Sequence, residues 1–311
     1  MTSSKAYVNA GIALAAAGAI LFSSKGVIIK LAYENGMSTV EVMLFRMAFS
    51  APVFALSAFL VARRQRLLIS GKDWALTILC GVLSYYLATW LSFYGLSYIS
   101  AQLERLILFT YPAFVVMGMA FLQRQLPSAK TVLAVVLSYA GIVTVFAKEL
   151  DFAAAAGSAE TQSDVWFGAF LVLCSALSYA ASVIIAKPLI VRMGSVFFTG
   201  LAMSVSCAAI ILHSAFTGAL DVERLSLVAG SDNLGLMLLM GIFGTVLPAY
   251  MLNEAIARIG PDKAAILGTI GPVATAMMAV AILGEMFTIY HAGALILCSL
   301  GVGVLTRSKQ S

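Results

Sequence analysis

The sequence predicts an all-α integral membrane protein of ten transmembrane helices, built as two inverted five-helix repeats. Three observations lead to this prediction. The chain is 61% hydrophobic and only 11% charged, whereas a soluble domain is about 25% charged. Its apolar residues gather into ten runs that are long enough to cross a bilayer. The chain also matches itself when one half is laid over the other.

The ten apolar runs define the predicted spans. A bilayer core about 30 Å thick requires about 20 apolar residues in a helix. The first run could be a signal peptide, but it is long, contains Lys25 and is followed by nine similar runs, so we interpret it as a span. The runs lie near residues 7–30, 39–62, 73–96, 100–122, 129–147, 165–190, 195–217, 234–256, 262–283 and 287–306.

The basic residues predict the orientation of the chain. With the N-terminus in the cytoplasm, twelve of the 19 lysines and arginines lie on that side, and only Lys148 and Arg224 lie on the other. Cytoplasmic loops carry an excess of Lys and Arg, so both termini are expected to face the cytoplasm at the cell's inner membrane. No basic patch interleaved with aromatic residues lies outside the spans, so no nucleic-acid partner is expected.

The internal match indicates a repeat. At an offset of 160 residues it runs without gaps from about Leu76 to Thr144, and the first two spans match at a slightly smaller offset. Chance similarity between apolar segments is the plain alternative, and paired glycines and prolines argue against it. These pairs include Gly81 with Gly241, Pro112 with Pro272, and Gly141 with Gly301.

The repeat divides the chain into residues 1–150 and 165–311, joined by a periplasmic linker, 151–164. Each half holds five spans. Because five is odd, the second half enters the membrane upside down relative to the first. Inverted repeats are typical of secondary transporters, whose substrate site lies near the membrane midplane between the repeats.

Several short motifs resemble a known family. They are Phe22-Ser23 in the first span, Arg46 in the second, the stretch from Ile99 to Pro112, and Leu283-Gly284-Glu285 closing the ninth span. Over essentially its whole length the chain resembles the EamA type of the drug/metabolite transporter superfamily. The resemblance implies export of amino acids or related metabolites, with sugars, nucleotides and cofactors as other substrates. One departure is Gln125, where first halves of the family often carry Glu.

Charged residues inside spans are functional candidates because each costs about 3 kcal/mol near the membrane centre. Lys25 follows Ser23 in the first span and could bind a substrate carboxylate, or it could snorkel to the outer interface. Arg46, in the second span, could neutralise a substrate or join an ion pair. Glu104 and Arg105 open the fourth span. They point about 100° apart on a helix, so each requires its own partner, and Glu104 could carry a coupling proton.

Aromatic residues form a stripe along the third span. Tyr86, Trp90 and Tyr94 are spaced four residues apart. At the repeat offset Trp90 matches Tyr250 and Tyr94 matches Glu254, so the eighth span presents a related stripe that ends in a carboxylate. Packing is the plain alternative for such a stripe. Glu254 could equally pair with Arg258 one turn away.

Further binding and hinge candidates lie in other spans. Tyr111 shares a helical face with Glu104, and Tyr179 lies in the sixth span near several serines. We expect the two aromatic stripes, with these tyrosines, to line a central cavity. Three prolines lie inside spans and each removes a helical hydrogen bond, which predicts hinges at Pro112, Pro248 and Pro272.

The sequence therefore predicts a secondary transporter that exports amino acids, aromatic or other neutral ones included, or related metabolites by alternating access. A zwitterionic amino acid and the lipid bilayer are the expected partners, and the protein is expected to be a monomer or homodimer. A nucleotide, cofactor or sugar transporter is the alternative, and a channel or membrane-embedded enzyme is the alternative from another class. No enzymatic motif, metal-ligand cluster, cofactor or ATP-binding motif is found, so no catalytic residue, metal or cofactor is expected.

Overall fold

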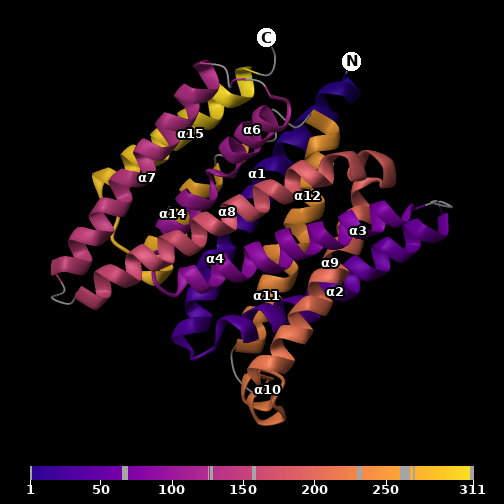
Figure 1. Ribbon diagram of the computed structural model, residues 1–311, viewed down its shortest axis with the longest axis horizontal. Helices are drawn as coiled ribbons and strands as arrows, with labels where there is room; N and C mark the ends of the chain where they lie inside the picture. Colours follow the sequence, from indigo (N-terminus) through magenta and orange to yellow (C-terminus); the bar gives the residue numbers. More distant parts are fainter. Residues whose placement is uncertain are drawn as a thin grey trace.

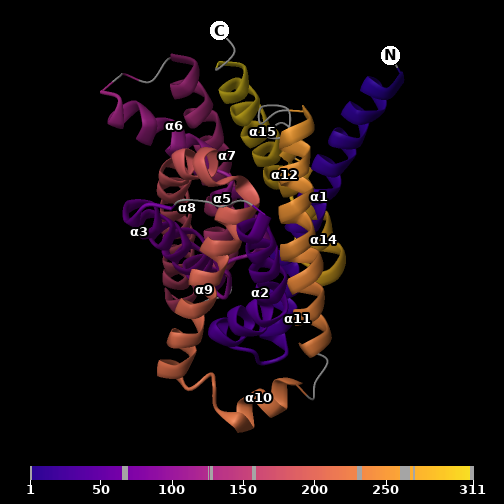
Figure 2. The same ribbon diagram turned by 90° about the vertical axis from the view of Figure 1, so that its right-hand side faces the viewer.

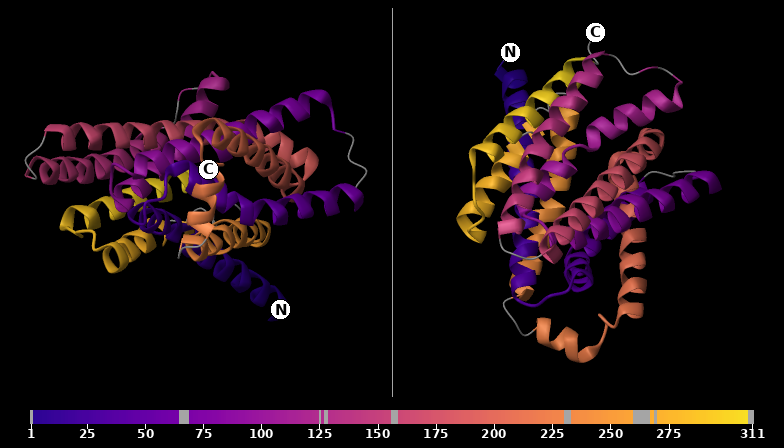
Figure 3. Two further views of the ribbon diagram at one scale, coloured as in Figure 1. Left: turned by 90° about the horizontal axis from the view of Figure 1, so that it is seen from below. Right: turned by 60° about the vertical axis from the view of Figure 1, so that its left-hand side comes forward.

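The computed structural model describes residues 2–64, 69–124, 126, 129–155, 159–229, 233–259, 267–268 and 270–308. Every regular element of these residues is a helix, and the helices pack side by side as one elongated bundle (Figure 1). The two ends of the chain emerge at one end of the bundle, and the short helix α10 (Val222–Ala229) lies at the other (Figures 2 and 3).

The helices of the first half of the chain cover five predicted spans. The third of these continues from α3 through a π-helix into α4, and the fourth is broken into α5 and α6. Their bounds are α1 (Thr2–Glu34), α2 (Thr39–Arg64), α3 (Gly71–Cys80), η1 (Gly81–Leu87), α4 (Ala88–Leu96), α5 (Ala101–Leu108), α6 (Tyr111–Leu122) and α7 (Ala129–Ala155).

The second half follows the same order. Its third predicted span also passes through a π-helix, from α11 into α12. The bounds are α8 (Ala159–Met193), α9 (Ser195–Thr217), α10, α11 (Asn233–Gly241), η2 (Ile242–Val246), α12 (Leu247–Ile259), α14 (Ile270–Leu283) and α15 (Ile289–Ser308). The start of the predicted ninth span, between Ile259 and α14, lies almost wholly outside the described residues.

Among the described residues, seven helical segments are long and apolar enough to cross a membrane. They fall on seven of the predicted spans, and two shorter apolar helices, Ile270–Leu283 and Ile289–Gly301, fall on the last two. The prediction of an all-helical membrane protein agrees with this structure. In hydrocarbon the backbone of a single span can satisfy its hydrogen bonds only as a helix.

Helix packing follows one pattern in both halves. The helix α7 packs along α15, and α2 packs along α9, so each of these pairs joins corresponding helices of the two halves (Figure 1). The remaining large contacts come in exchanged pairs: α1 with α12 and α8 with α4; α1 with α14 and α8 with α5 and α6; α2 with α11 and α9 with η1. When each predicted span is taken as a whole, swapping the halves leaves this set of contacts the same.

Two glycines, one in each half, make equivalent close contacts with the other half. A Cβ at Gly241 would lie 2.8 Å from Cβ of Phe49 and 3.2 Å from the Arg46 carbonyl oxygen on α2. A Cβ at Gly81 would lie 2.9 Å from Cβ of Val205 and 2.6 Å from the carbonyl oxygen of Ala202, on α9. Both glycines therefore let a third span approach the second span of the other half at backbone distance.

The π-helices η1 and η2 begin directly at or after these glycines, at matching positions of the repeat. A π-turn inserts one extra residue into a helix and is often found at functional sites. In η2 the hydroxyl of Thr245 donates to the carbonyl oxygen of Met240, 3.1 Å away. Such side-chain bonds satisfy backbone oxygens that the wider turn leaves poorly paired.

Of the three predicted hinge prolines, Pro112 follows a helix break, whereas Pro248 and Pro272 lie within helical segments. Pro112 lies in the first turn of α6, just after the break at residues 109–110. The expectation of a kink within one continuous helix differs from this structure, because proline fits the first turn of a new helix, where no amide hydrogen is needed. Pro248 is the second residue of α12, and Pro272 the third of α14. Two continuous helices, α2 and α8, also contain prolines that the sequence analysis did not single out.

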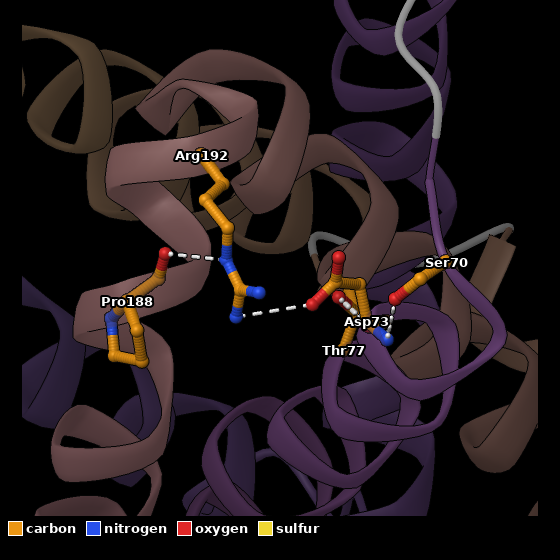
Figure 4. A network of polar contacts seen from close by, with 5 residues as sticks. All are labelled: Ser70, Asp73, Thr77, Pro188 and Arg192. Carbon is orange, nitrogen blue, oxygen red and sulfur yellow. Dashed lines mark hydrogen bonds and ion pairs between the residues drawn. The ribbon is translucent and has the colours of Figure 1, made fainter.

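An ion pair between α8 and α3 joins the two halves (Figure 4). Arg192, in the last turn of α8, lies 3.0 Å from a carboxylate oxygen of Asp73 in α3 and also donates to the Pro188 carbonyl oxygen at 3.2 Å. Ser70 caps α3 by accepting from the Asp73 amide. A second polar contact joins the halves between the end of α1 and the start of α11. The side-chain amide of Asn35 donates to the side-chain oxygen of Asn233, the first residue of α11, at 3.0 Å.

We predict that Gly241→Ala destabilises the protein by about 1–3 kcal/mol, because overpacking a tight contact costs this much. Thermal unfolding of the purified protein in detergent measures the change. Gly235→Ala is the matched control on the same helix, since nothing lies within 4 Å of a Cβ there and alanine is favoured over glycine in a helix. Equal melting temperatures for the two variants would contradict the close contact.

Candidate functional site

Four charged side chains gather inside the bundle. Lys25 comes from α1, Arg46 from α2, and Glu104 and Arg105 from α5. Arg46 is 4% exposed and Glu104 is 3% exposed, while Lys25 and Arg105 are half-buried. All four were candidates from the sequence, and the structure brings them into one cluster, called here the charged cluster.

Two phenylalanine rings lie between its cations. The ammonium of Lys25 lies 4.9 Å from the ring centre of Phe22 and 5.2 Å from that of Phe93. The guanidinium of Arg46 lies 5.3 Å from Phe93, and that of Arg105 lies 5.3 Å from Phe22. A desolvated cation gains about 2 kcal/mol from a ring face. The rings therefore offset part of the cost of burying three positive groups.

Glu104 is held by a hydroxyl from α4. The hydroxyl of Ser92 donates to its Oε1 at 2.5 Å. The other carboxylate oxygen faces Gly26 of α1, where an added Cβ would lie 3.8 Å away. No cation of the charged cluster lies within ion-pair distance of Glu104 among the interactions of the described residues. The carboxylate is therefore fixed by a neutral donor and acts on the cations through space.

Arg105 reaches across to α1 and α14. One terminal nitrogen, Nη2, donates to the Ser23 hydroxyl at 3.4 Å, and Ser23 donates in turn to the Ala19 carbonyl oxygen. A Cβ at Gly271 would lie 2.8 Å from Nη2 and 3.0 Å from the Ser23 hydroxyl oxygen, so a larger residue there would displace the guanidinium. Glu104 and Arg105 have separate partners, as the helical angle between neighbouring residues requires.

The charged cluster is incompletely neutralised. It holds three positive groups and one negative group. The Nε atoms of Arg46 and Arg105 are both buried without a hydrogen-bond partner in the described part of the chain. Buried charges are ordinarily paired and hydrogen-bonded, because an isolated charge loses its hydration. The cluster is therefore suited to accept a negatively charged group.

The aromatic stripe of the third span faces the opposite half. Tyr86 hydrogen-bonds to Nδ1 of His213 on α9 at 3.1 Å. The ring of Trp90 stacks on Tyr94 at 5.8 Å and meets His213 edge-on at the same distance. The sequence expected this stripe to face the stripe of the eighth span; in the structure its ring contacts reach α9.

Tyr250 lies apart from that stripe and stacks on Phe54 of α2 at 5.8 Å. Each stripe thus contacts the second span of the other half. Tyr111 and Tyr179, by contrast, are brought together: their rings meet edge-on at 5.0 Å and join α6 to α8. The predicted aromatic residues therefore lie at contacts between the two halves, which is where a solute pathway between repeats would run.

Glu254 pairs with Arg258, one turn further along α12, at 2.8 Å. The carboxylate side chain is 50% exposed, and Arg258 also lies 4.8 Å from the ring centre of Tyr7. This local pair is the alternative that the spacing predicted, and it places Glu254 away from the charged cluster.

Two carboxylates hold the start of α5, beyond the charged cluster. Glu285, between α14 and α15, accepts from the amides of Ala101 and Gln102 at 2.7 and 3.3 Å. Glu149 of α7 accepts from the hydroxyl of Ser100. Burial raises the pKa of Glu149, and the hydrogen bonds from Ser100 oppose that rise. Negative groups are favoured at a helix N-terminus, so these contacts fix α5, which carries Glu104 and Arg105.

The sequence analysis missed several partners in the charged cluster, namely Ser92, Phe93, Gly26 and Gly271. They lie far along the chain from the charges they contact, so no local pattern reports them. It also assigned no role to Phe22, which is three residues before Lys25. Side chains three residues apart share a helix face, a signal that could have identified it.

The charged cluster is closely packed in this structure. A cavity of about 330 Å³ lies instead between α2, α3 and α9, lined by Ala58, Phe59, Ala62, Ile69, Trp74, Phe197 and Leu201. None of the four charges lines it. Among the described residues, no group of three or more His, Cys, Asp or Glu side chains could hold a metal ion.

A family model described as "EamA-like transporter family" matches residues 9–147 and again residues 166–307. The chain belongs to the EamA-like transporter family. This confirms the resemblance found in the sequence, and it makes the protein a multi-pass membrane transporter rather than an enzyme by family. Gln125, where the family resemblance is weaker, lies outside the described residues.

Other comparisons agree with the EamA-like assignment. The chain is 29% identical over 272 residues to "Uncharacterized transporter YcbK" of Bacillus subtilis (strain 168), covering 86% of this chain and 83% of that protein. One solved crystal structure has a TM-score of 0.64 and 16% sequence identity, covering 97% of this chain and 99% of the solved one. At this identity the second comparison supports the fold alone.

We predict that Ser92→Ala destabilises the protein by about 1.5–3 kcal/mol, because hydrogen bonds to charged groups are worth this much. In a double-mutant cycle with Glu104→Gln, the two effects should not add, since they share one bond. Thermal unfolding in detergent measures both. Ser57→Ala, whose hydroxyl donates to the Phe54 carbonyl oxygen of its own helix, is the control and should add to Glu104→Gln. Additivity for Ser92 as well would show that the bond is not formed.

Proposed function

We propose that this EamA-like protein is a secondary transporter that exports amino acids or related small metabolites across the inner membrane by alternating access. The observation that carries the proposal is the charged cluster. Three cations and one carboxylate lie between spans in a family of transporters, and charges inside a membrane protein ordinarily mark substrate or ion pathways. An amino acid offers a carboxylate to the cations and an ammonium to Glu104.

The ten-span inverted repeat is part of this proposal. The double match of the family model, the exchanged helix contacts and the matching positions of Gly81 and Gly241 support it. Residues 1–150 and 165–311 are then the two repeats, joined through 151–164. The excess of basic residues on one side supports cytoplasmic termini.

Alternating access requires helices that can move against one another around a fixed site. The segments at Pro112, Pro248 and Pro272 are the proposed hinges, because each proline lacks the amide hydrogen that a helix interior uses; Pro112 also follows a helix break, and Pro248 follows the π-helix η2. Trp90 and Tyr250 are proposed to line the pathway, since both lie where one half contacts the other. Glu104 is the proposed coupling carboxylate, because it is buried at the cluster.

Efflux from proteoliposomes tests the proposal. Purified protein is reconstituted into vesicles loaded with a mixture of amino acids, a sugar and a nucleoside, and the efflux of each is followed with and without a pH gradient. Saturable loss of amino acids alone is the expected result. Efflux of the sugar or nucleoside alone would leave the transporter assignment intact and overturn the proposed substrate.

We predict that Lys25→Ala reduces this efflux by about tenfold or more, because a lost hydrogen bond to a charged group is worth about 1.5–3 kcal/mol. Lys72→Ala is the matched control, since Lys72 is exposed outside the predicted spans. Membrane insertion and thermal stability are checked for both variants. Normal efflux by a well-folded Lys25→Ala protein would remove this lysine from the site.

A further inference from the structure

We propose that the transported solute carries net negative charge on two anionic groups, as a dicarboxylate or an acidic amino acid does. The inference deepens the proposed function and rests on it, because it concerns the same site. It changes the expected cargo from a neutral zwitterion to an anion.

The first support is the balance of charge. Lys25, Arg46 and Arg105 contribute three positive charges, and Glu104 contributes one negative charge, so the cluster has a surplus of two. A neutral zwitterion adds no net charge and leaves that surplus buried. A dicarboxylate neutralises this surplus, and an acidic amino acid, with a net charge of −1, halves it; burying ions is tolerated when they are paired.

The second support is the surroundings of Arg46. Its side chain is 96% buried, since only 4% is exposed, and its Nε has no hydrogen-bond partner among the described residues. Its guanidinium contacts the ring of Phe93. A guanidinium carries five donors arranged to match a carboxylate or phosphate. A desolvated arginine without an anionic partner is suited to receive one from a ligand.

The third support is the order of the groups. From Arg46 the series runs through Phe93, Lys25 and Phe22 to Arg105. Cations and rings therefore alternate, with a cation at each end and one in the middle. The arginines at the two ends of the series, Arg46 and Arg105, can each bind one anionic group. Glu104, fixed by Ser92, remains available for the ammonium of an acidic amino acid.

The fourth support is the second half of the chain. At the repeat offsets, the positions that match Lys25, Arg46, Glu104 and Arg105 are all alanines, namely Ala181, Ala202, Ala264 and Ala265. The second half of the sequence therefore lacks these four charges. Retaining four costly charges in one half alone is a feature of a binding site rather than a requirement of the fold.

The test uses the full-length protein in proteoliposomes, each population loaded with one probe at the same concentration. The probes are leucine, glutamate, succinate, glycerol phosphate and glucose. The membrane potential is clamped so that net charge does not limit flux. Thermal unfolding of the detergent-solubilised protein with each probe gives a second readout that does not depend on transport.

Faster efflux of glutamate or succinate than of leucine, by at least about tenfold, is the expected result, together with stabilisation by the same probes. Glycerol phosphate distinguishes a phosphate dianion from paired carboxylates. Faster efflux of leucine would overturn the charge inference and leave amino-acid export standing. Succinate efflux without any amino acid would support the charge inference and overturn amino-acid export. Transport of glucose alone, or no efflux and no stabilisation by any probe, would overturn both.

Arg46→Gln tests the assignment of the charge. We predict at least about tenfold lower efflux of the dianionic probe and loss of its thermal stabilisation, with Arg46→Lys retaining part of both. Lys72→Gln removes the same charge from an exposed position and should change neither. If Arg46→Gln does not fold, Arg46→Lys still tests the inference through its reduced stabilisation by the probe. Unchanged efflux and stabilisation in a folded arginine variant would overturn the inference.

Discussion

The structure depends on one constraint: inside hydrocarbon, each backbone amide and carbonyl group must find its partner within the protein. Unbroken helices meet this constraint without help. Where this chain departs from a regular helix, hydroxyl groups stand close by. Thr110 donates to the Ile107 carbonyl oxygen at the break between α5 and α6, and Thr245 donates to Met240 in η2. Ser50 donates to the Gly241 carbonyl oxygen, just before η2. The backbone groups at these departures are therefore hydrogen-bonded rather than left unpaired.

The lack of water in the hydrocarbon core also explains the composition of the charged cluster. Charges that a soluble protein would hydrate must here be met by rings, hydroxyls and one another. Phe22 and Phe93 lie against the cations, and Ser92 and Ser23 meet Glu104 and Arg105. These neutral groups lower the cost of burial without cancelling charge. Neutral partners keep the buried charges stable without a ligand. The net positive charge of the cluster still favours an anion.

The sequence predicted the spans well because hydropathy adds up along one helix. The second span was expected at 39–62, and α2 runs from Thr39 to Arg64. The π-helices and the break after Leu108 were missed, because they change hydrogen-bond register without changing hydropathy. The four charges were found because charge is conspicuous in an apolar run. Their partners were not, because Ser92, Phe93 and Gly271 meet them only through packing between helices distant in sequence. The spacing also could not show that each aromatic stripe would contact the second span of the other half.

The two halves share a fold and differ in charge, and the difference is systematic. Where the halves pack on each other the same positions recur, as at Gly81 and Gly241. Where the first half carries the charged cluster, the second carries alanine. Two polar contacts between the halves also differ in charge: Asp73 and Arg192 form an ion pair, while Asn35 and Asn233 form a neutral hydrogen bond. The packing contacts between the halves are therefore nearly symmetric, whereas the charged cluster belongs to the first half alone. If the cluster is the proposed binding site, one set of groups recognises the solute within a nearly symmetric packing.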